Sequence, residues 1–312
     1  MIVVHGLTKQ YRNTRAVDNL SFSVHAGAVT GFLGPNGSGK STTMRMVMGL
    51  DNPTAGTALI DGRPFAELRW PMREVGALLD AKAFHPGRTA YDHLRVLAQT
   101  NDIPRGRVDE VLDIVGLTSV AHQRTKKYSL GMGQRLGIAT ALLGDPGVLL
   151  FDEPINGLDP EGIRWVRFLL RDLAAEGRTV FVSSHLITEM SLTAERLVVI
   201  GRGRLIADTS VEEFTVKNKP SAVRVVTPKT DSFACVLRQA GAVANVEEDG
   251  AIVATGMTSA EIGELAARRA FALHELSPLM MSLEDAFMEL TQDAVEFEAG
   301  GSRRPSSVSA SR

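Results

Sequence analysis

The strongest chemical signal in the sequence is a glycine-rich segment that directly follows a short apolar run. Residues 29–33 read VTGFL, and residues 34–41 read GPNGSGKS, which satisfies the pattern G-x-x-x-x-G-K-[ST]. Glycines at this spacing let consecutive backbone N–H groups turn inward around phosphate oxygens, and the following helix N-terminus adds a partial positive charge. We expect Lys40 to reach the β- and γ-phosphates of a nucleotide and Ser41 to hold Mg²⁺. The predicted nucleotide-binding residues here are Gly34, Pro35, Asn36, Gly37, Ser38, Gly39, Lys40, Ser41 and Thr42.

A pair of carboxylates follows another apolar run, VLLFDEP, at residues 148–154. On its own, such a pair could simply mark a solvated strand end. Because the glycine-rich loop lies upstream in the same chain, we expect both side chains to emerge where the carboxyl edge of a sheet opens. We predict that Asp152 binds Mg²⁺, directly or through water, and that Glu153 polarises the attacking water.

A third segment, YSLGMGQR at residues 128–135, places two glycines at the start of a helical run. Glycine beside a helix start is typical of close backbone approach, and such an N-terminus, with the hydroxyl of Ser129, could donate to a γ-phosphate. Two geometries satisfy this interpretation. The segment folds across the nucleotide of its own chain, or a two-fold dimer sets Ser129 of each chain against the Lys40 loop of the other. The composition of the segment leaves both open.

The elements that must position these residues alternate along the chain. Residues 1–75 read as short strands with one helix from near Lys40, and residues 89–145 read as mostly helical. Strands and an amphipathic helix alternate again from residue 147, and a hairpin is expected around residues 201–203. This order predicts an α/β fold with a parallel sheet covered on both faces.

The composition turns polar near residues 217–220, where we expect a domain boundary. Beyond it, strand (AVRVV), helix (FACVLRQAGA), hairpin, helix (AEIGELAARRA) and strand (FALHEL) predict a small ferredoxin-like α+β extension over residues 221–293. Its last helix, LEDAFMEL, is expected to be capped by Ser282, with Asp285 returning to the cap. The Ser/Gly/Arg-rich tail, residues 294–312, lacks apolar anchors and is expected to be disordered.

Composition restricts the class of protein. The 312 residues suffice for two domains, and the 44% apolar content is ample for a core. A net charge of −2 does not favour a nucleic-acid partner, and the single cysteine, Cys235, excludes an intrachain disulfide. We identify no signal peptide and no run of about 18 apolar residues, so a membrane role is expected to need a partner protein.

Taken in order, GPNGSGKST, YSLGMGQR, FDEPINGLDP and SSHL resemble the nucleotide-binding subunit of an ATP-binding cassette (ABC) transporter, over residues 1 to about 220. The resemblance implies the P-loop NTPase cassette fold, with a RecA-like α/β core, an antiparallel β subdomain and an α-helical subdomain at about residues 87–145. It also implies ATP and Mg²⁺ as ligands and a head-to-tail homodimer that sandwiches two ATP molecules. In that dimer Ser129 and Gly131 bind the partner's γ-phosphate, and Asp159 helps to couple the two sites.

Three further positions take their roles from the resemblance. His185, at the end of TVFVSSH, matches the histidine that bonds the γ-phosphate and helps to place the attacking water, so Glu153 and His185 are the expected catalytic residues. Tyr11 matches the aromatic residue that stacks on adenine, and Val17 is expected to border the same base. A histidine at a strand end is otherwise more often structural, and a single surface tyrosine proves little.

At two places the sequence departs from the family pattern, and both bear on which branch of the family it resembles. The signature segment, commonly LSGGQ, reads YSLGM here, with Leu130 in place of a glycine and Met132 in place of the glutamine. The SLGM form resembles the exporter branch associated with daunorubicin or bacitracin resistance. Asp80 stands where the family usually has a glutamine that senses Mg²⁺ and touches the membrane subunit. An aspartate keeps an acceptor for Mg²⁺-bound water but loses the amide donor and one methylene of reach.

These features predict an ATP-hydrolysing subunit of an ABC-2-type exporter of drugs, antibiotics or other hydrophobic solutes. It would work peripherally, at the cytoplasmic face of the cell membrane, with a separate transmembrane permease and without nucleic acid. An importer ATPase of the same fold is the alternative, against which the SLGM signature, Asp80 and the C-terminal extension speak. A soluble ABC protein acting on ribosomes or DNA is a further alternative, disfavoured by the single cassette. The transported substrate is read by the membrane subunit, so this sequence does not identify it.

Overall fold

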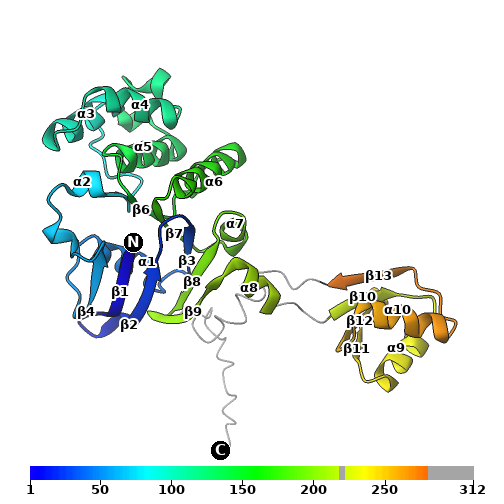
Figure 1. Cartoon of the computed structure of the whole chain (residues 1–312). Helices are drawn as coiled ribbons and strands as arrows, with labels where there is room; N and C mark the ends of the chain where they lie inside the picture. The colour runs from blue at the N-terminus through cyan, green and yellow to red at the C-terminus, as the bar shows by residue number, and fades with distance from the viewer. Residues whose placement is uncertain (218–221, 280–312) are drawn as a thin grey trace, which may run out of the picture. The chain divides into compact units, whose positions relative to one another are not determined.

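The computed structural model describes residues 1–217 and 222–279 (Figure 1). By their internal contacts these residues divide into two compact units, one running from Met1 to Val211 and one beginning at Glu212. The expected terminal helix with its Ser282 cap and the expected disordered tail lie outside the described residues. Residues 218–221 also lie outside the described part of the chain, so the domain boundary at residue 220 stays a prediction.

The first unit contains two sheets (Figure 1). Their strands are β1 Ile2–Tyr11, β2 Thr14–Val24, β3 Val29–Leu33, β4 Ala55–Ile60, β5 Val75–Leu78, β6 Val148–Asp152, β7 Thr179–Ser184, β8 Arg196–Gly201 and β9 Arg204–Ser210. The larger sheet has the order β5-β6-β7-β3-β8-β9 and is parallel except for the β8–β9 hairpin, which the sequence predicts. The smaller sheet, β2-β1-β4, is antiparallel.

Eight helices lie within the described residues up to 217: α1 Lys40–Val47, α2 Pro71–Glu74, α3 Ala90–Thr100, α4 Gly106–Ile114, α5 Leu130–Leu142, α6 Pro160–Ala175, α7 Ile187–Ser191 and α8 Val211–Lys217. Helices α3, α4 and α5 pack on one another, and α5 also packs on β5 (Figure 1). The predicted helical region between residues 89 and 145 is thus a separate group of helices beside the sheet. Among the residues described, none of the helices is both long and apolar enough to cross a membrane.

The core of the first unit lies between the two sheets. Three buried rings meet there: Phe22 of β2, Phe32 of β3 and Phe181 of β7, with centroids 5.0–5.5 Å apart. Helix α1 adds the fully buried Met44 to the same cluster. All five residues of β3 are buried because both faces of the parallel sheet are covered, which explains the unbroken apolar run before the glycine-rich loop.

Helix α5 lies close to the sheet because glycines stand at the contact. A Cβ atom added to Gly76 of β5 would overlap the carbonyl oxygen of Ala141 in α5. One turn earlier in the helix, a Cβ at Gly137 would overlap the side chain of Leu78, the last residue of β5. The backbones of α5 and β5 therefore pack directly on each other, which fixes where the N-terminus of α5 points.

After α8, the second unit forms a four-stranded antiparallel sheet with two helices. Its elements are β10 Ala222–Val226, α9 Thr230–Gln239, β11 Val243–Val246, β12 Ile252–Thr255, α10 Ser259–Arg268 and β13 Glu275–Leu279, with sheet order β11-β12-β10-β13. The order of elements is the predicted βαββαβ. The prediction of a strand over FALHEL, residues 271–276, is wrong for its first four residues, since β13 begins at Glu275. Phe271 instead packs its ring on Phe233 of α9, with centroids 4.9 Å apart.

We predict that Gly76→Ala lowers the unfolding midpoint of the protein, because the new methyl group must displace backbone rather than a flexible side chain. Overpacking of this kind typically costs about 1–3 kcal/mol. The matched control is Gly147→Ala, where an added Cβ meets nothing within 4 Å. Thermal unfolding of the two variants and the wild type measures the difference, and equal midpoints for both variants would contradict the packing described for α5 and β5.

Candidate functional site

The glycine-rich loop of residues 34–39 runs from the end of β3 to the start of α1. Gly39, at the helix N-cap position, has the left-handed φ of +104°, and a Cβ there would lie 2.5 Å from the carbonyl oxygen of Ala16. Because glycine offers no capping side chain, the first N–H groups of α1 are open toward the loop. Unpaired N–H groups at a helix N-terminus, together with the helix dipole, suit a phosphate group.

A cavity of about 230 Å³ lies at this loop. Its lining residues are Ala16, Asn36, Gly37, Ser38, Gly39, Lys40, Ser41, Thr42 and Glu153. The structure thus brings most of the predicted loop residues to one cavity with the predicted general base. Ala16, which the sequence analysis did not select, contributes from β2. Gly34 and Pro35 lie behind the cavity, where their carbonyl oxygens hold Lys40.

Lys40 places a buried positive charge in this cavity. Its ammonium Nζ donates to the carbonyl oxygens of Gly34 at 2.7 Å and Pro35 at 3.3 Å, and it lies 3.8 Å from Oε1 of Glu153. Burial lowers the pKa of Lys40, and the charges of Glu153 and Asp152 oppose that shift. An anionic phosphate bound beside Nζ would favour the protonated ammonium in the same way.

The hydroxyl of Ser38 is the clearest sign of a missing polar contact in the loop. Ser38 is 3% exposed, and its Oγ is a buried atom without a hydrogen-bond partner among the described residues. Buried hydroxyls normally find a partner, because an unpaired one costs the desolvation of the group. A ligand oxygen in the cavity would supply that contact, so the donor set of the loop fits a phosphate.

Asp152 and Glu153 stand at the carboxyl end of β6 and are tied to the neighbouring β7. Asp152 accepts a hydrogen bond from the hydroxyl of Ser183, and the backbone N–H of Glu153 donates to Ser183 Oγ at 3.0 Å. Glu153 has a left-handed φ of +50°, which is uncommon for a residue with a side chain. Both of its carboxylate oxygens lie 3.0 Å from Nδ1 of His185. The predicted base and the predicted histidine are therefore in direct contact.

Oxygen ligands near the loop suit Mg²⁺. No cluster of three or more His, Cys, Asp or Glu side chains able to hold a metal is found within residues 1–217 and 222–279. At nucleotide sites Mg²⁺ is usually bound by one or two protein oxygens together with substrate phosphates and waters. The hydroxyl of Ser41 and the carboxylate of Asp152 are oxygen donors of that kind.

The signature segment forms the start of α5. Ser129 caps this helix by accepting a hydrogen bond from the N–H of Met132 at 3.2 Å. At Gly131 an added Cβ would lie 3.3 Å from the carbonyl oxygen of Gly157, so the segment packs against the turn that follows β6. Neither Ser129 nor Gly131 lines the cavity at Lys40. Ser129 borders a different cavity of about 510 Å³, which also involves Lys82 and Lys126.

Gln134, five residues after the capping serine, is a residue that the sequence analysis missed. Its side chain is buried at 4% exposure, and its amide donates to the carbonyl oxygens of Glu153 at 3.1 Å and Asn156 at 3.2 Å. The helix α5 is otherwise largely apolar, and only this glutamine interrupts its buried positions with a long polar side chain. A glutamine in this apolar pattern is the feature of the sequence from which Gln134 could have been identified.

Asp159 and the two residues predicted to hold adenine have other contacts. Asp159 caps α6 by accepting from the N–H of Gly162 at 2.8 Å. Tyr11 is 43% exposed at the end of β1, and its hydroxyl donates to Asp51 at 3.1 Å. Burial and the Asp51 carboxylate raise the pKa of this tyrosine. Val17 has no exposed surface, and its side chain packs in the core.

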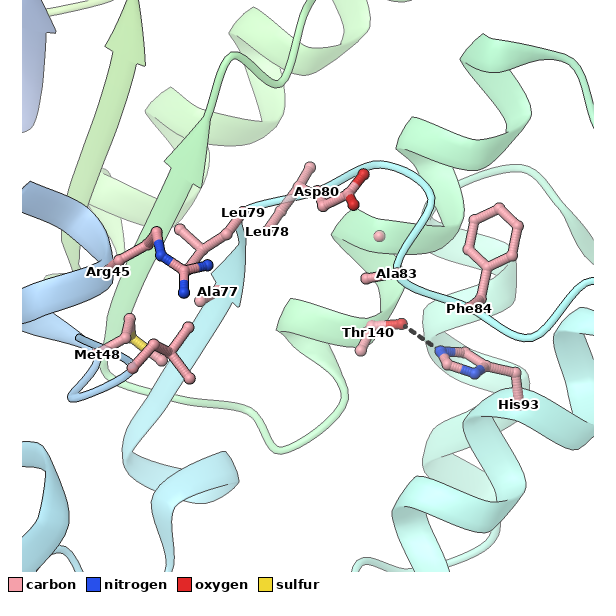
Figure 2. A pocket seen from close by; sticks show the side chains of 12 residues that line it. Arg45, Met48, Ala77, Leu78, Leu79, Asp80, Ala83, Phe84, His93 and Thr140 are labelled. Carbon is pink, nitrogen blue, oxygen red and sulfur yellow. Dashed lines mark hydrogen bonds between the residues drawn. The ribbon is translucent and has the colours of Figure 1, made fainter. Parts of the chain in front are cut away.

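Asp80 lies in the loop after β5 and lines a cavity separate from that at Lys40. This cavity, of about 320 Å³, has Arg45 and Met48 on one side and Phe84 and His93 on the other (Figure 2). Asp80 accepts a hydrogen bond from the backbone N–H of Lys82 at 2.8 Å, which shapes its own loop. Asp80 is not among the residues that line the phosphate cavity.

His93 is the titratable side chain on the far wall of that cavity. Its Nε2 lies 3.4 Å from the hydroxyl of Thr140 (Figure 2). Burial lowers the pKa of His93, and the charge of Arg88 lowers it further.

Comparison with known proteins agrees with this geometry. The family model described as "ABC transporter" matches residues 17–156, and a model for a domain of unknown function matches residues 221–284. The uncharacterized ABC transporter ATP-binding protein YhcH of Bacillus subtilis is 36% identical over 299 residues, which span 95% of this chain and 97% of the relative.

Two relatives have names that specify a cargo. The bacitracin transport ATP-binding protein BcrA of Bacillus licheniformis is 40% identical over 68% of this chain and 71% of its own length. The lantibiotic transport ATP-binding protein SrtF of Streptococcus pyogenes is 33% identical over 67% of this chain and 90% of its own length.

Solved structures confirm the predicted cassette fold. The dimeric bacterial ABC transporter cassette MJ0796 matches with a TM-score of 0.63 and 26% identity, over 68% of this chain and 99% of the cassette. CbiO1 of Clostridium perfringens matches with a TM-score of 0.61 and 27% identity, over 77% of this chain and 96% of CbiO1. With its glycine-rich loop, carboxylate pair and near full-length relative, the chain is an ABC ATPase and belongs to the ATP-binding proteins of the ABC transporter family.

Proposed function

We propose that this protein is the ATP-hydrolysing subunit of an ABC exporter and that it works as a head-to-tail homodimer. One observation carries the proposal: the carboxylate of Glu153 lies 3.8 Å from Nζ of Lys40, with which it lines one cavity, and 3.0 Å from Nδ1 of His185. A site for binding alone would not need a carboxylate beside a histidine. That pair suits the activation of a water molecule.

The proposed reaction assigns roles to the residues of the site. Lys40 and the N–H groups of the loop would hold the β- and γ-phosphates, and Ser41 and Asp152 would hold Mg²⁺, which would offset the negative charge of the transferred group. Glu153 accepts a proton from the attacking water. His185, whose Nδ1 contacts both oxygens of Glu153, keeps that carboxylate in orientation and bonds the γ-phosphate. Tyr11 stacks on adenine, with Val17 as the apolar support beneath.

The dimer supplies the second half of the site. The signature helix does not line its own chain's phosphate cavity, which supports a role in trans for Ser129 and Gly131. The MJ0796 relative, described as a dimeric ABC cassette, shows that a chain of this fold can pair. In this proposal Asp159 couples the two sites, while its carboxylate also caps α6.

The direction proposed here, export, is supported by the relatives whose names specify bacitracin and lantibiotic transport. The proposed cargo class is a drug, an antibiotic or another hydrophobic solute, moved by a separate transmembrane permease at whose cytoplasmic side this subunit would sit. Asp80, at the position that the resemblance places beside the membrane subunit and Mg²⁺-bound water, lines the cavity in Figure 2. Import by the same kind of ATPase is the second candidate, and a permease gene without a substrate-binding protein beside it would argue against import.

We predict that Glu153→Gln lowers the rate of ATP hydrolysis by about 10²–10⁴-fold, because an amide cannot accept the proton of the attacking water. Binding of ATP should persist, since Lys40 and the loop are unchanged. Phosphate release and nucleotide binding measure the two effects separately. Glu161→Gln, an exposed change in the first turn of α6, is the control. Wild-type turnover in Glu153→Gln would remove Glu153 from the role of base.

We also predict that the specific ATPase rate rises with protein concentration, because each site needs Ser129 of a second chain. Ser129→Arg should abolish this rise by setting a bulky cation where the γ-phosphate of the partner site must lie, while each monomer still binds ATP. The measurement is the hydrolysis rate per chain over a dilution series of both proteins. A rate per chain that is independent of concentration and unaffected by Ser129→Arg would contradict the shared site.

A further inference from the structure

The turn after β6 holds Glu153 in an unusual backbone conformation. Its φ of +50° is left-handed, and left-handed residues with side chains persist only where surrounding contacts over-determine them. On the N-terminal side, the N–H of Glu153 is fixed by the Ser183 hydroxyl at 3.0 Å and by the Ser183 carbonyl oxygen at 3.3 Å. The carbonyl group of Glu153 needs a restraint of its own. Without one, the backbone of Glu153 could rotate and turn the carboxylate away from His185.

Gln134 supplies that restraint. Its Nε2 donates to the carbonyl oxygen of Glu153 at 3.1 Å and to that of Asn156 at 3.2 Å, so one amide spans the turn. The turn is closed on the other side by the N–H of Asn156, which donates to Glu153 at 3.2 Å. Both N–H donors of the Gln134 amide thus bind carbonyl oxygens of the turn that carries the catalytic carboxylate.

The chemistry of the amide indicates why this residue is a glutamine. Its Oε1 is buried without a hydrogen-bond partner among the described residues, so the acceptor half of the amide contributes nothing here. An apolar side chain of equal length would avoid that cost, but it would take from the carbonyl oxygen of Asn156 the donor it now has and leave that of Glu153 with the N–H of Asn156. A glutamate would turn a carboxylate toward two carbonyl oxygens. A donor at this position therefore suits the turn.

Gln134 also stands on the helix whose N-terminus is proposed to meet the partner's nucleotide. Five residues separate it from Ser129, or about 7.5 Å along a helix with a rise of 1.5 Å per residue. The first turn of α5 is packed against the same segment, since an added Cβ at Gly131 would lie 3.2 Å from Leu158. The signature helix therefore contacts the turn after β6 at two places, through Gln134 at Glu153 and through Gly131 at Leu158.

We propose that Gln134 is a positioning residue, which holds Glu153 in its left-handed conformation and connects the signature helix to the catalytic carboxylate of the same chain. This inference rests on the proposed function for the role of Glu153. The contact itself is independent of that role. A chain in which Gln134 cannot donate should bind ATP normally and hydrolyse it slowly, because the carboxylate is free to leave the attacking water.

The test uses the full chain with Gln134→Met, which keeps the length of the side chain and removes its donors. We expect kcat to fall about tenfold, the equivalent of about 1.4 kcal/mol and of one or two lost buried hydrogen bonds. The KM for ATP should stay at the wild-type value. Gln99→Met, the same change at an exposed site on α3, is the matched control. An unchanged kcat in Gln134→Met, or a loss confined to KM, would overturn the proposal.

A second variant separates positioning from simple structural support. In Gln134→Glu the side chain accepts but does not donate when ionised, and it regains one donor when protonated. Its kcat relative to wild type should therefore rise as the pH is lowered, whereas for Gln134→Met the ratio should stay constant. A ratio for Gln134→Glu that does not change with pH would contradict a role as donor.

Hydrogen exchange tests the contact without any ATPase assay. In Gln134→Met the backbone N–H of Asn156 should exchange faster than in wild type, since the turn has lost its clamp, and Gln99→Met should leave the rate unchanged. Equal exchange in Gln134→Met and wild type would overturn the proposal even in a protein without turnover. Failure of the wild type to hydrolyse ATP would instead count against the proposed function alone.

Discussion

The parallel register of three neighbouring strands is the constraint on which the site depends. Strand β7 lies between β6 and β3, with Ser183 opposite Asp152 and Ser184 opposite Leu33. Because parallel strands paired in this way end at the same edge of the sheet, the glycine-rich loop, the carboxylate pair and His185 emerge side by side. A shift by one residue in the pairing of β6 with β7 would reverse the facing of every side chain in the shifted strand and separate Glu153 from His185. The same shift between β3 and β7 would displace the glycine-rich loop from both residues.

That edge gathers opposite charges. Lys40 is nearly buried, and the carboxylate 3.8 Å from it is that of Glu153, the proposed general base. Glu153 is held by contacts from three directions: Ser183 at its N–H, Gln134 at its carbonyl oxygen and His185 at its carboxylate. The strained backbone at Glu153 is thus offset by a hydrogen-bond network whose members come from β7, α5 and the loop after β7. The signature helix belongs to the support of its own chain's site as well as to the proposed contact with the partner.

Much of this could be predicted from sequence because the strongest signals are local. The loop from Gly34 to Ser41, the apolar runs before it and before Asp152, and the βαββαβ order of the second unit all follow from short patterns. The contacts of Gln134 and Ala16 could not, because they join residues far apart in the chain and depend on how α5 and β2 pack. Phe271 shows the limit of a local pattern, because an apolar run that looked like a strand is used for packing.

Helix α1 joins two parts of the molecule that were described separately. It begins at Lys40 in the phosphate cavity, and Arg45 and Met48 at its other end form a wall of the cavity in Figure 2. Its eight residues span about 12 Å at 1.5 Å per residue and contain neither proline nor glycine. A helix of that kind resists bending. The phosphate cavity and the cavity that Asp80 lines therefore share one short, stiff element as a common wall.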